Sequence, residues 1–465
     1  MKVHSSLQAL LHQAHVVALG GAFLTAVAVL GACASGDVAG ESASESEVSS
    51  AKRLPNQTAW AEGTHWSHES KFMGLPHAWV YRPTGFSKAV ANKRGVVFHL
   101  PGCGEEPFQV AMASGWADAA EEHGLVIVVP EVLDPAHPNK VSPNVACYRF
   151  GSTFSAPTRY SEDHAAIIAA GQKIVKDADL AIDPNQVYLA GLSAGATVAM
   201  EVGCMAPEIF AGVVSVAGTA MGTNQDAAVL PPTLVPSQVR FFCTGYAALS
   251  PASNATEMLK KQSYVIVSDN NGLPAGVPYF DASTWTWTAS KFSNLDYWDG
   301  DKYVPYAHHD LIASAMAPVF GAEEAGKNLD LGLTGKERGC PGGEKSHDDT
   351  ADVKCKFIDG VERNWRALAD VWKDEAGLER IVHVKQDTLQ HRWPSGPIGP
   401  NDRAVSPSVK DLQAAGFIDQ NWNYVTEKVN AAPNGQLAFA FFANSSFSLP
   451  KYLGEHLAKN NPRLQ

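Results

Sequence analysis

The sequence has no cluster of lysine or arginine side chains, and its overall charge has the opposite sign. It contains 36 basic and 48 acidic residues, for a formal net charge of −12. Because a basic patch is the usual footprint of a nucleic-acid partner, its absence argues against DNA or RNA as a ligand. The sequence also lacks long-range repeats and the His-Glu-x-x-His spacing of many zinc enzymes.

Charged residues are few in total, at 18%, whereas hydrophobic residues make up 45% of the sequence. A chain of this composition is globular and can bury a large core. Its 465 residues exceed the usual length of one domain, although α/β folds often run this long as a single unit.

The amino-terminal segment has the composition of a targeting signal. Lys2 precedes an apolar run over residues 16–32, which ends in Leu-Gly-Ala-Cys33. A basic start, an apolar middle and a small-residue exit are typical of a signal peptide, and this ending resembles a bacterial lipobox. We therefore expect residues 1–33 to be a lipoprotein signal peptide, with Cys33 lipidated. Ordinary cleavage near Ala34 and an uncleaved membrane anchor are the alternatives.

The next residues are expected to form a tether. Residues 34–56 are small and polar, with almost no large apolar side chain, so they cannot bury enough surface to become ordered. The composition turns globular from Trp60, and we assign residues 57–465 to one folded domain. The protein is then exported, to the periplasm or the cell surface if lipid-anchored and otherwise secreted.

Export changes how the cysteines are interpreted. Six follow Cys33, at positions 103, 147, 204, 243, 340 and 355. An even number in an oxidising compartment favours disulfides over free thiols or metal ligands. Six cysteines allow 15 connectivities, which sequence alone does not distinguish.

The most informative stretch is residues 187–195. It reads as a short apolar strand, then Gly-x-Ser-x-Gly, followed by a helix of small residues. This order predicts a nucleophile elbow, in which Ser193 is exposed at a strained corner between strand and helix. Gly191 and Gly195 must be small so that the two elements can pass each other. A glycine-rich turn without catalytic function is the alternative.

Apolar segments alternate with amphipathic ones along the rest of the chain. We expect strands at residues 77–82, 95–100, 125–129, 187–192, 212–217, 239–243 and 381–384, and helices at residues 108–123, 161–176 and 361–376. Such alternation predicts a doubly wound α/β fold with a mostly parallel sheet. Residues 263–360 break the rhythm, with one strand-like run at 264–267. We therefore expect a long insertion there, before the last core strand and on the catalytic face.

Several segments together resemble the extracellular poly(3-hydroxybutyrate) depolymerase and feruloyl esterase group of α/β-hydrolases. They are residues 98–104, 147–150, 182–195, 210–218 and 391–396. The resemblance spans about residues 75–260 and 360–396, and it implies an α/β-hydrolase fold and ester hydrolysis.

Two positions depart from the family pattern. Pro101 stands where the family has a histidine, which alters the loop but leaves its backbone donors in place. The family's acid follows a strand as Gly-x-x-Asp, whereas residues 245–248 here contain no carboxylate.

The resemblance and the chemistry of acyl transfer assign roles to particular residues. Ser193 is the expected nucleophile, and His391, in the segment similar to the family's His-x-Trp-Pro loop, is the expected base. The backbone N–H groups of Cys103 and Ala194 are the expected oxyanion donors. The resemblance favours a Cys103–Cys147 disulfide; elimination then leaves Cys204–Cys243 and Cys340–Cys355.

The orienting acid is the least defined member of the site. Asp269 lies at the end of a strand-like run and precedes His391, as the chain order Ser, acid, His requires. We take Asp269 as the first candidate. The remaining candidates are Asp226, Asp281, Asp299 and Asp310.

Two histidine-rich stretches, residues 308–310 and 347–349, invite a metal interpretation. Their spacing is not that of a ligand set, and we expect no metal and no cofactor. A group of aromatic residues in the predicted insertion either lines an apolar substrate groove or forms a small core of its own. They are Trp285, Trp287, Tyr297 and Trp298.

The sequence thus predicts an exported, lipid-anchored serine carboxylic-ester hydrolase that acts through an acyl-enzyme. Polyhydroxyalkanoate oligomers, feruloyl or acetyl esters and small esters are the expected substrates, and the membrane is contacted through Cys33. The alternatives are an inactive binding lipoprotein on the same fold, suggested by the missing Gly-x-x-Asp carboxylate, and a serine peptidase. The oligomeric state is left open.

Overall fold

The computed structural model of the protein describes part of the second of two units into which the chain divides, Lys52–Gln465. The described residues are 66–83, 94–103, 105, 107, 110–111, 114–131, 147–151, 162–228, 230–269, 280–281, 286–287, 304–331, 344–346, 354–356, 362–364, 367–386, 389, 391, 393–395, 442–443 and 447–465. The predicted signal peptide, Cys33 and the tether over 34–56 lie outside them. None of the helices in these ranges has the length and apolar character needed to cross a membrane.

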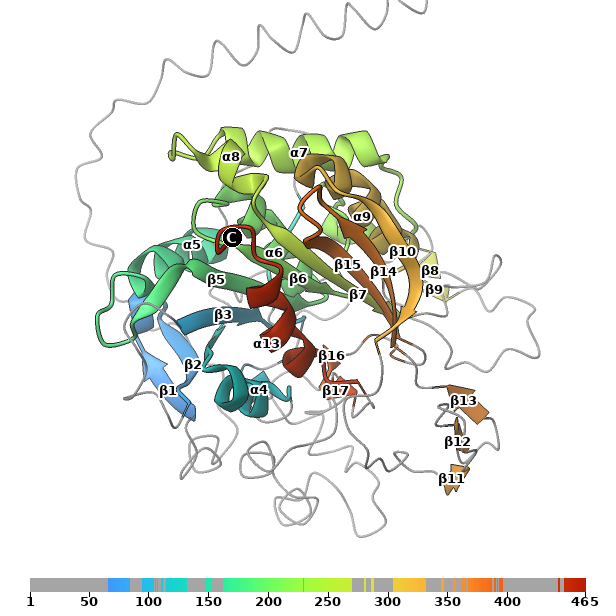
Figure 1. The fold of residues 1–465 in the computed structure, drawn as a ribbon, viewed down its shortest axis with the longest axis horizontal. Helices are drawn as coiled ribbons and strands as arrows, with labels where there is room; N and C mark the ends of the chain where they lie inside the picture. The colour runs from blue at the N-terminus through green and yellow to red at the C-terminus, as the bar shows by residue number, and fades with distance from the viewer. Residues whose placement is uncertain are drawn as a thin grey trace, which may run out of the picture. The chain divides into compact units, whose positions relative to one another are not determined.

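One mixed sheet of ten strands organises this unit (Figure 1). Its strands, in spatial order, are β1 (Trp66–Ser70), β2 (His77–Tyr81), β4 (Val126–Pro130), β3 (Arg94–Leu100), β5 (Ile182–Leu192), β6 (Gly212–Val216), β7 (Ser263–Asp269), β15 (Glu379–Gln386), β14 (Ala367–Lys373) and β10 (Glu323–Asp330). The strands from β4 to β15 run parallel, and those at both edges run antiparallel. The α/β class and the mostly parallel α/β-hydrolase sheet are therefore confirmed.

Helices cover both faces of the sheet. One face carries α5 (Glu162–Ile174), α6 (Ala194–Met205), α7 (Pro236–Ala248), α8 (Ala255–Leu259) and α9 (Ala307–Phe320), and the other carries α4 (Trp116–His123) and α13 (Leu449–Lys459). Alternate residues of each strand enter the two layers: Phe98 packs in the first and Val97 in the second. This burial on both faces explains why the central strands are continuous apolar runs.

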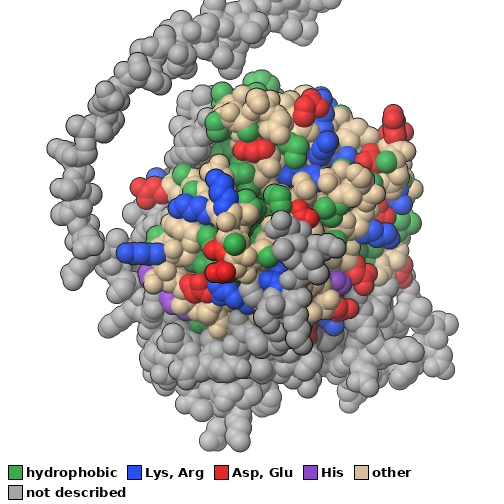
Figure 2. Space-filling model, turned by 60° about the vertical axis from the view of Figure 1, so that its left-hand side comes forward, with side chains coloured by type: hydrophobic (Ala, Val, Ile, Leu, Met, Phe, Trp, Pro, Cys, Tyr) green, Lys and Arg blue, Asp and Glu red, His purple; other side chains and the backbone are tan. Residues whose placement is uncertain are grey.

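Short elements complete the description. They are the 3-10 helices η2 (Phe72–Gly74) and η4 (Gln225–Ala227), the pair β8 (Phe280–Asp281) and β9 (Thr286–Trp287), the small sheet of β11 (Glu344–Ser346), β12 (Lys354–Lys356) and β13 (Glu362–Asn364), and the pair β16 (Trp393–Pro394) and β17 (Phe442–Ala443). On the face shown in Figure 2, basic and acidic side chains are interspersed among the described residues.

The strand predicted at residues 239–243 is wrong, because these residues lie in the middle of helix α7. Val239 and Cys243 are buried four positions apart on one helical face, while Phe241 between them is 63% exposed. Pro236 occupies the start of the helix, where its missing N–H is tolerated. A short apolar run is compatible with either a buried strand or a buried helical face, so periodicity alone does not separate the two.

The helix predicted at residues 361–376 is also wrong, because β13 and β14 occupy this range. Along β14, Ala367, Ala369 and Val371 are buried, while the residues between them are partly exposed, which is the alternation of a strand. The turn after β14 contains Gly377, with φ of 81°. Gly377 therefore stops a strand rather than a helix.

Part of the stretch predicted as an insertion belongs to the main sheet. Strand β7 lies at its centre between β6 and β15, helix α9 packs against β7 and β15, and β10 forms one edge. The interruption of the fold within residues 263–360 is therefore smaller than expected.

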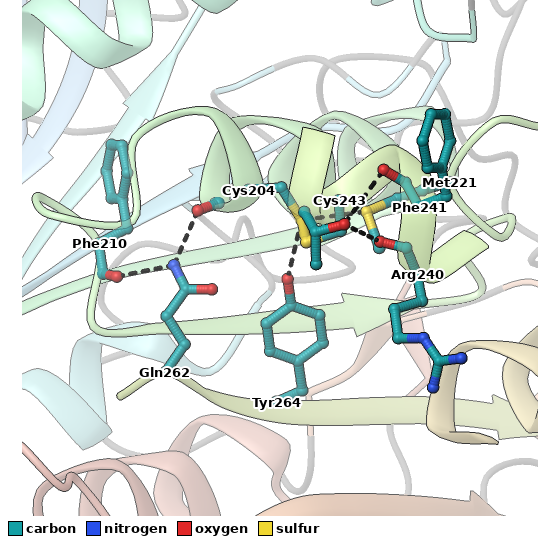
Figure 3. Close-up of a disulfide and its surroundings, with 10 residues drawn as sticks. Cys204, Phe210, Met221, Arg240, Phe241, Cys243, Gln262 and Tyr264 are labelled. Atoms are coloured by element: carbon teal, nitrogen blue, oxygen red, sulfur yellow. Dashed lines mark hydrogen bonds between the residues drawn. A yellow bond between two sulfur atoms is a disulfide. The ribbon is translucent and has the colours of Figure 1, made fainter. Parts of the chain in front are cut away.

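A disulfide joins helices α6 and α7, as predicted for Cys204 and Cys243 (Figure 3). Beside it, the side-chain amide of Gln262 donates to two backbone carbonyls, that of Gly203 at 2.8 Å and that of Phe210 at 2.9 Å. The predicted Cys340–Cys355 pair lies outside what the structure describes, because Cys340 is not among the described residues.

Residues that follow α13 hold the beginning of β5. The Asn461 side-chain amide donates to the backbone carbonyl of Asn185 at 2.6 Å and to the Tyr188 hydroxyl at 3.0 Å. The Arg463 guanidinium donates to the carbonyl of Phe210 at 2.7 Å, close to where β6 begins. These contacts join segments separated by more than 250 positions.

Candidate active site

The corner between β5 and α6 has the backbone predicted for a nucleophile elbow. Ser193 is the residue between strand and helix, and its φ of 56° and ψ of −120° are unusual for a residue with a side chain. Its N–H donates to the carbonyl of Val216 at 2.8 Å, which fixes the corner against the end of β6. Such strain persists only where the surrounding structure enforces it, and it is common at functional sites.

The two glycines of the motif are required by close backbone contacts. A Cβ at Gly191 would lie 2.5 Å from the carbonyl carbon of Gly195. A Cβ at Gly195 would lie 2.1 Å from the carbonyl oxygen of Leu100 and 2.4 Å from that of Pro101. These distances leave no room for a side chain, so the glycines allow both the corner and its approach to the loop after β3.

The loop after β3 lies directly beside Ser193. A Cβ placed on Gly102 would be 3.4 Å from the Ser193 Cβ. The N–H of Gly102 donates to Glu105 Oε2 at 2.6 Å, and the N–H of Glu105 donates back to the Gly102 carbonyl at 3.1 Å. The predicted disulfide between Cys103 and Cys147 is present and ties this loop to the segment over residues 147–151.

Glu105 is a buried carboxyl group that sequence reasoning did not single out. Its side chain is 3% exposed, and burial raises its pKa to about 8, while the hydrogen bond from Gly102 acts in the opposite direction. Burial also raises the pKa of Tyr148 well above its ordinary value, and the negative charges of Asp163 and Glu105 raise it further. An acid two positions after Cys103 gave no signal, because its burial depends on the tertiary packing of this loop.

His391 is half-buried and follows the last central strand, β15. Two positions on, the Trp393 indole donates to the carbonyl of Ser114 at 3.0 Å, and its ring lies 4.4 Å from that of His99. His99 pairs in register with Ala190, three positions before Ser193. The His391 segment is therefore anchored to strands at the centre of the sheet, near the end that carries Ser193.

His99 is a spacer rather than a second base. It is fully buried and accepts a hydrogen bond from the Trp116 indole at 2.9 Å. Burial lowers its pKa to about 3, so the ring is neutral at physiological pH. The three aromatic rings of His99, Trp116 and Trp393 pack together and fix the base of the loop over residues 100–103.

Asp269 is the last residue of β7 and is buried. It lies opposite Gln386, the last residue of β15, five positions before His391. In the alternation along β7 it shares a face with Val265 and Val267, which pack in the same layer as Trp393. Asp269 therefore lies at the end of the strand beside β15, on the sheet face that carries Trp393.

The other candidate acids are placed differently or are not described. Asp310 is exposed on α9, across the sheet, and its carboxylate lies 3.5 Å from His383 Nδ1. The structure gives only the backbone for Asp226 and Asp281, and Asp299 lies outside the described residues.

Asp310 lies at the exposed end of a cluster that the sequence did not predict, whose other members are buried. The Ser268 hydroxyl lies 2.8 Å from His383 Nε2, so this cluster also contains a serine, a histidine and an aspartate. Ser268 is 1% exposed and His383 is 0% exposed, with the rings of Tyr306 and His309 packed beside His383. Because Ser268 and His383 are buried, this serine is not accessible from solvent.

The histidine-rich stretches give no ligand set within the described residues. His308 is held by the N–H of Ala220, which lies 3.2 Å from Nδ1, and by the carbonyl of Leu230, 2.9 Å from Nε2. Residues 347–349 are outside the described ranges, as are the side chains of the aromatic group at Trp285, Trp287, Tyr297 and Trp298.

Comparison with known proteins supports the resemblance seen in the sequence. The family described as esterase PHB depolymerase matches residues 78–231. A poly(3-hydroxybutyrate) depolymerase of Ralstonia pickettii is 28% identical over 404 residues, which cover 84% of this chain and 67% of that protein. The predicted resemblance to this family is confirmed.

Solved esterase structures show more distant similarity. An acetyl xylan esterase from Aspergillus awamori aligns with a TM-score of 0.41 at 11% identity, covering 70% of this chain and 93% of that protein. A ferulic acid esterase aligns with a TM-score of 0.33 at 15% identity, covering 55% and 85% of the two chains.

Proposed function

We infer that this chain, with its esterase PHB depolymerase segment at residues 78–231, is a carboxylic ester hydrolase that acts through Ser193. The observation that carries the proposal is the strained backbone of Ser193 at the β5–α6 corner, with the Gly102 loop beside it. A serine held at such a corner projects its hydroxyl away from both elements, and the amino end of the helix favours negative charge.

In the proposed reaction, Ser193 Oγ attacks the ester carbonyl carbon while His391 accepts the hydroxyl proton. The carbonyl oxygen becomes an oxyanion, which accepts hydrogen bonds from the N–H groups of Cys103 and Ala194. The intermediate collapses, the C–O bond to the alcohol breaks, and His391 returns the proton to the leaving alcohol. His391 then accepts a proton from water, whose oxygen attacks the acyl carbon. The bond from that carbon to Ser193 Oγ breaks, His391 returns the proton to Oγ, and the acid is released.

The contacts around Gly102 support this assignment of donors. Because Glu105 already accepts the hydrogen bond from the Gly102 N–H, the next N–H in the loop is that of Cys103. A single oxyanion donor contributes about 2.7–4 kcal/mol to transition-state stabilisation. Such a donor is effective only if it is held rigidly, which is the role we propose for the Cys103–Cys147 disulfide.

Asp269 is the acid we propose for His391. The alternative of an inactive binding protein depends on the absence of a carboxylate at residues 245–248. These residues form the last turn of helix α7 and do not follow a strand, so their lack of a carboxylate says nothing about the catalytic acid. A carboxylate is present instead at the end of β7, the strand beside β15, where Asp269 is the last residue.

The substrate class we propose is an ester of a hydroxyalkanoic acid, as in the polymer named for the relative from Ralstonia pickettii. Feruloyl and acetyl esters are the competing substrates. The two disulfides fit an oxidising compartment, in keeping with the proposed export and with a lipid anchor on Cys33. Both would be tested by following incorporation of labelled fatty acid into the protein and into its Cys33→Ala variant.

Labelling by a fluorophosphonate probe tests the nucleophile. We expect the wild-type protein to be labelled, the Ser193→Ala variant to be unlabelled, and the Ser268→Ala variant to be labelled like the wild type. Labelling that survives Ser193→Ala would refute the assignment. Release of hydroxy acid from amorphous poly(3-hydroxybutyrate), compared with release from feruloyl and acetyl esters, then identifies the substrate class.

A further inference from the structure

Two histidines and a glutamate meet at the edge of the sheet that contains β1, β2 and β4. His68 lies on β1, His77 lies on β2, and Glu131 directly follows β4. His68 pairs in register with Trp79, two positions from His77, so both imidazoles lie on one face of the hairpin. The N–H of Glu131 donates to the carbonyl of His77 at 3.2 Å, which brings the carboxylate to the same place.

The donor atoms are close enough to share one ion. His68 Nε2 lies 2.9 Å from Glu131 Oε1, and one ligand atom from each of the three residues lies within 4.8 Å of the others. Ligands about 2.1 Å from a tetrahedral zinc ion are separated from one another by about 3.3 Å. Small rotations of the three side chains would therefore bring the donor atoms from the observed separations to those that a zinc ion requires.

The state of His77 points to a missing ligand. Its Nδ1 is buried, and within the described part of the chain it has no hydrogen-bond partner. Its ring lies parallel to that of His68, with centroids 5.4 Å apart and an interplanar angle of 10°. A buried imidazole nitrogen without a partner is unfavourable, and a bound cation would remove this penalty for His77.

We propose that His68, His77 and Glu131 bind one divalent transition-metal ion of the zinc class. Two imidazoles and one carboxylate are donors that Zn²⁺ accepts, with water in the fourth position. The Glu131 side chain is 34% exposed, so the ion and its water are reached from solvent. In Figure 2, histidine side chains (purple) are visible at the molecular surface.

The position of this site indicates a structural role. β3 lies between β4, which Glu131 follows, and β5, which Ser193 follows. β4 and β5 are therefore two strand spacings apart, which is about 10 Å. The ion would join the β1–β2 hairpin to the end of β4, and so hold the edge of the sheet closed. No sequence motif predicts the site, because His68 and Glu131 are 63 positions apart.

Zinc binding by the full chain tests the proposal. The protein is stripped with EDTA, dialysed, and titrated with Zn²⁺ by calorimetry, with Co²⁺ absorption as a spectroscopic check of coordination. We expect one site in the wild type, and at least about tenfold weaker binding in His77→Gln and in Glu131→Gln. At one Zn²⁺ concentration that saturates the wild type, the rise in Tm should be smaller in both variants than in the wild type.

Matched substitutions separate this site from other histidines and carboxylates of the chain. His123→Gln and Glu122→Gln, both on α4, should bind Zn²⁺ as the wild type does. Circular dichroism establishes that each variant is folded, and His77→Gln is the milder change because its Nδ1 makes no hydrogen bond in the described structure. Absence of zinc binding by the wild type, or equal affinity in all variants, would overturn the proposal.

Discussion

Ser193 and Ser268 stand near the carboxyl ends of two parallel strands, yet their surroundings differ completely. Ser193 lies at a strained corner, with φ of 56°, lined by glycines and by the loop after β3. Ser268 lies within a regular strand, is 1% exposed, and already has the Ser–His–Asp contacts of a triad through His383 and Asp310. A hydrogen bond to a histidine therefore does not by itself mark a serine as the nucleophile, and we propose this role for Ser193 alone. Access and backbone donors distinguish the two sites.

The largest expected effect comes from exchanging the two serines for alanine. We expect Ser193→Ala to lower kcat for p-nitrophenyl butyrate by about 10⁴-fold or more, because the nucleophile is lost. Ser268→Ala should keep a kcat within about twofold of the wild type, and lower the free energy of unfolding by about 1–3 kcal/mol, because His383 loses a partner. The measurements are initial rates and urea denaturation. A large rate loss in Ser268→Ala would show that Ser268 also takes part in the reaction.

The two aspartates sharpen the same comparison. Asp269→Asn should lower kcat by about 10⁴-fold if it orients His391, as loss of the orienting acid does in a serine protease. Asp310→Asn should leave kcat unchanged, since Asp310 contacts the buried His383. Steady-state kinetics of both variants decide the matter. Equal activity of Asp269→Asn and wild type would remove Asp269 from the mechanism.

A smaller effect is expected from a methyl group at the corner. In Gly195→Ala the new Cβ would meet the carbonyl oxygens of Leu100 and Pro101 at 2.1 and 2.4 Å, so the loop must shift. We expect kcat to fall about 100-fold and stability to fall by about 1–3 kcal/mol. Gly245→Ala, on α7, meets nothing within 4 Å, and should leave kcat unchanged and raise stability by about 0.5–1 kcal/mol. Similar kcat losses in both would show that the corner is not special.

The last expected effect is on the pH dependence of stability and not on kcat. Burial raises the pKa of Glu105 to about 8, above its value in the unfolded chain. The folded state then binds the proton more tightly, so this group contributes stability at low pH that is lost as the pH rises towards 8. The slope is at most about 1.4 kcal/mol per pH unit. Urea denaturation between pH 5.5 and 8 should show a flatter dependence in Glu105→Gln than in the wild type.

A matched control for this prediction is Glu122→Gln on the exposed side of α4. It removes the same charge at the surface, and we expect its pH dependence to match that of the wild type. If Glu105→Gln retains the wild-type slope, the carboxyl group of Glu105 does not carry the effect.

The elbow was predictable because its requirements are local. A strand, two glycines around Ser193 and a helix of small residues lie within about 20 positions, and the structure confirms the backbone they predict. The apolar central strands were predictable for the same reason, since burial on both faces leaves only apolar residues.

The errors arose where local pattern and tertiary context disagree. Residues 239–243 look like a buried strand, but they are helical in the structure, and Cys243 faces α6, to which its disulfide joins it. The alternating burial along β14 was present in the sequence and was misread as helical. The meetings of Ser268 with His383 and of His68 with Glu131 depend on strand order and register, which no local pattern specifies.

The hydrogen bond from Asn461 to Asn185 also has a consequence for folding during synthesis. A ribosome adding 5–20 residues per second needs roughly 14–55 s to go from one to the other, given the 276 positions between them. During that interval the strand that leads to Ser193 is synthesised but lacks its closing contact. Contacts this distant in sequence slow folding. The nascent chain is therefore exposed to aggregation and proteolysis until β5 forms its contact with Asn461.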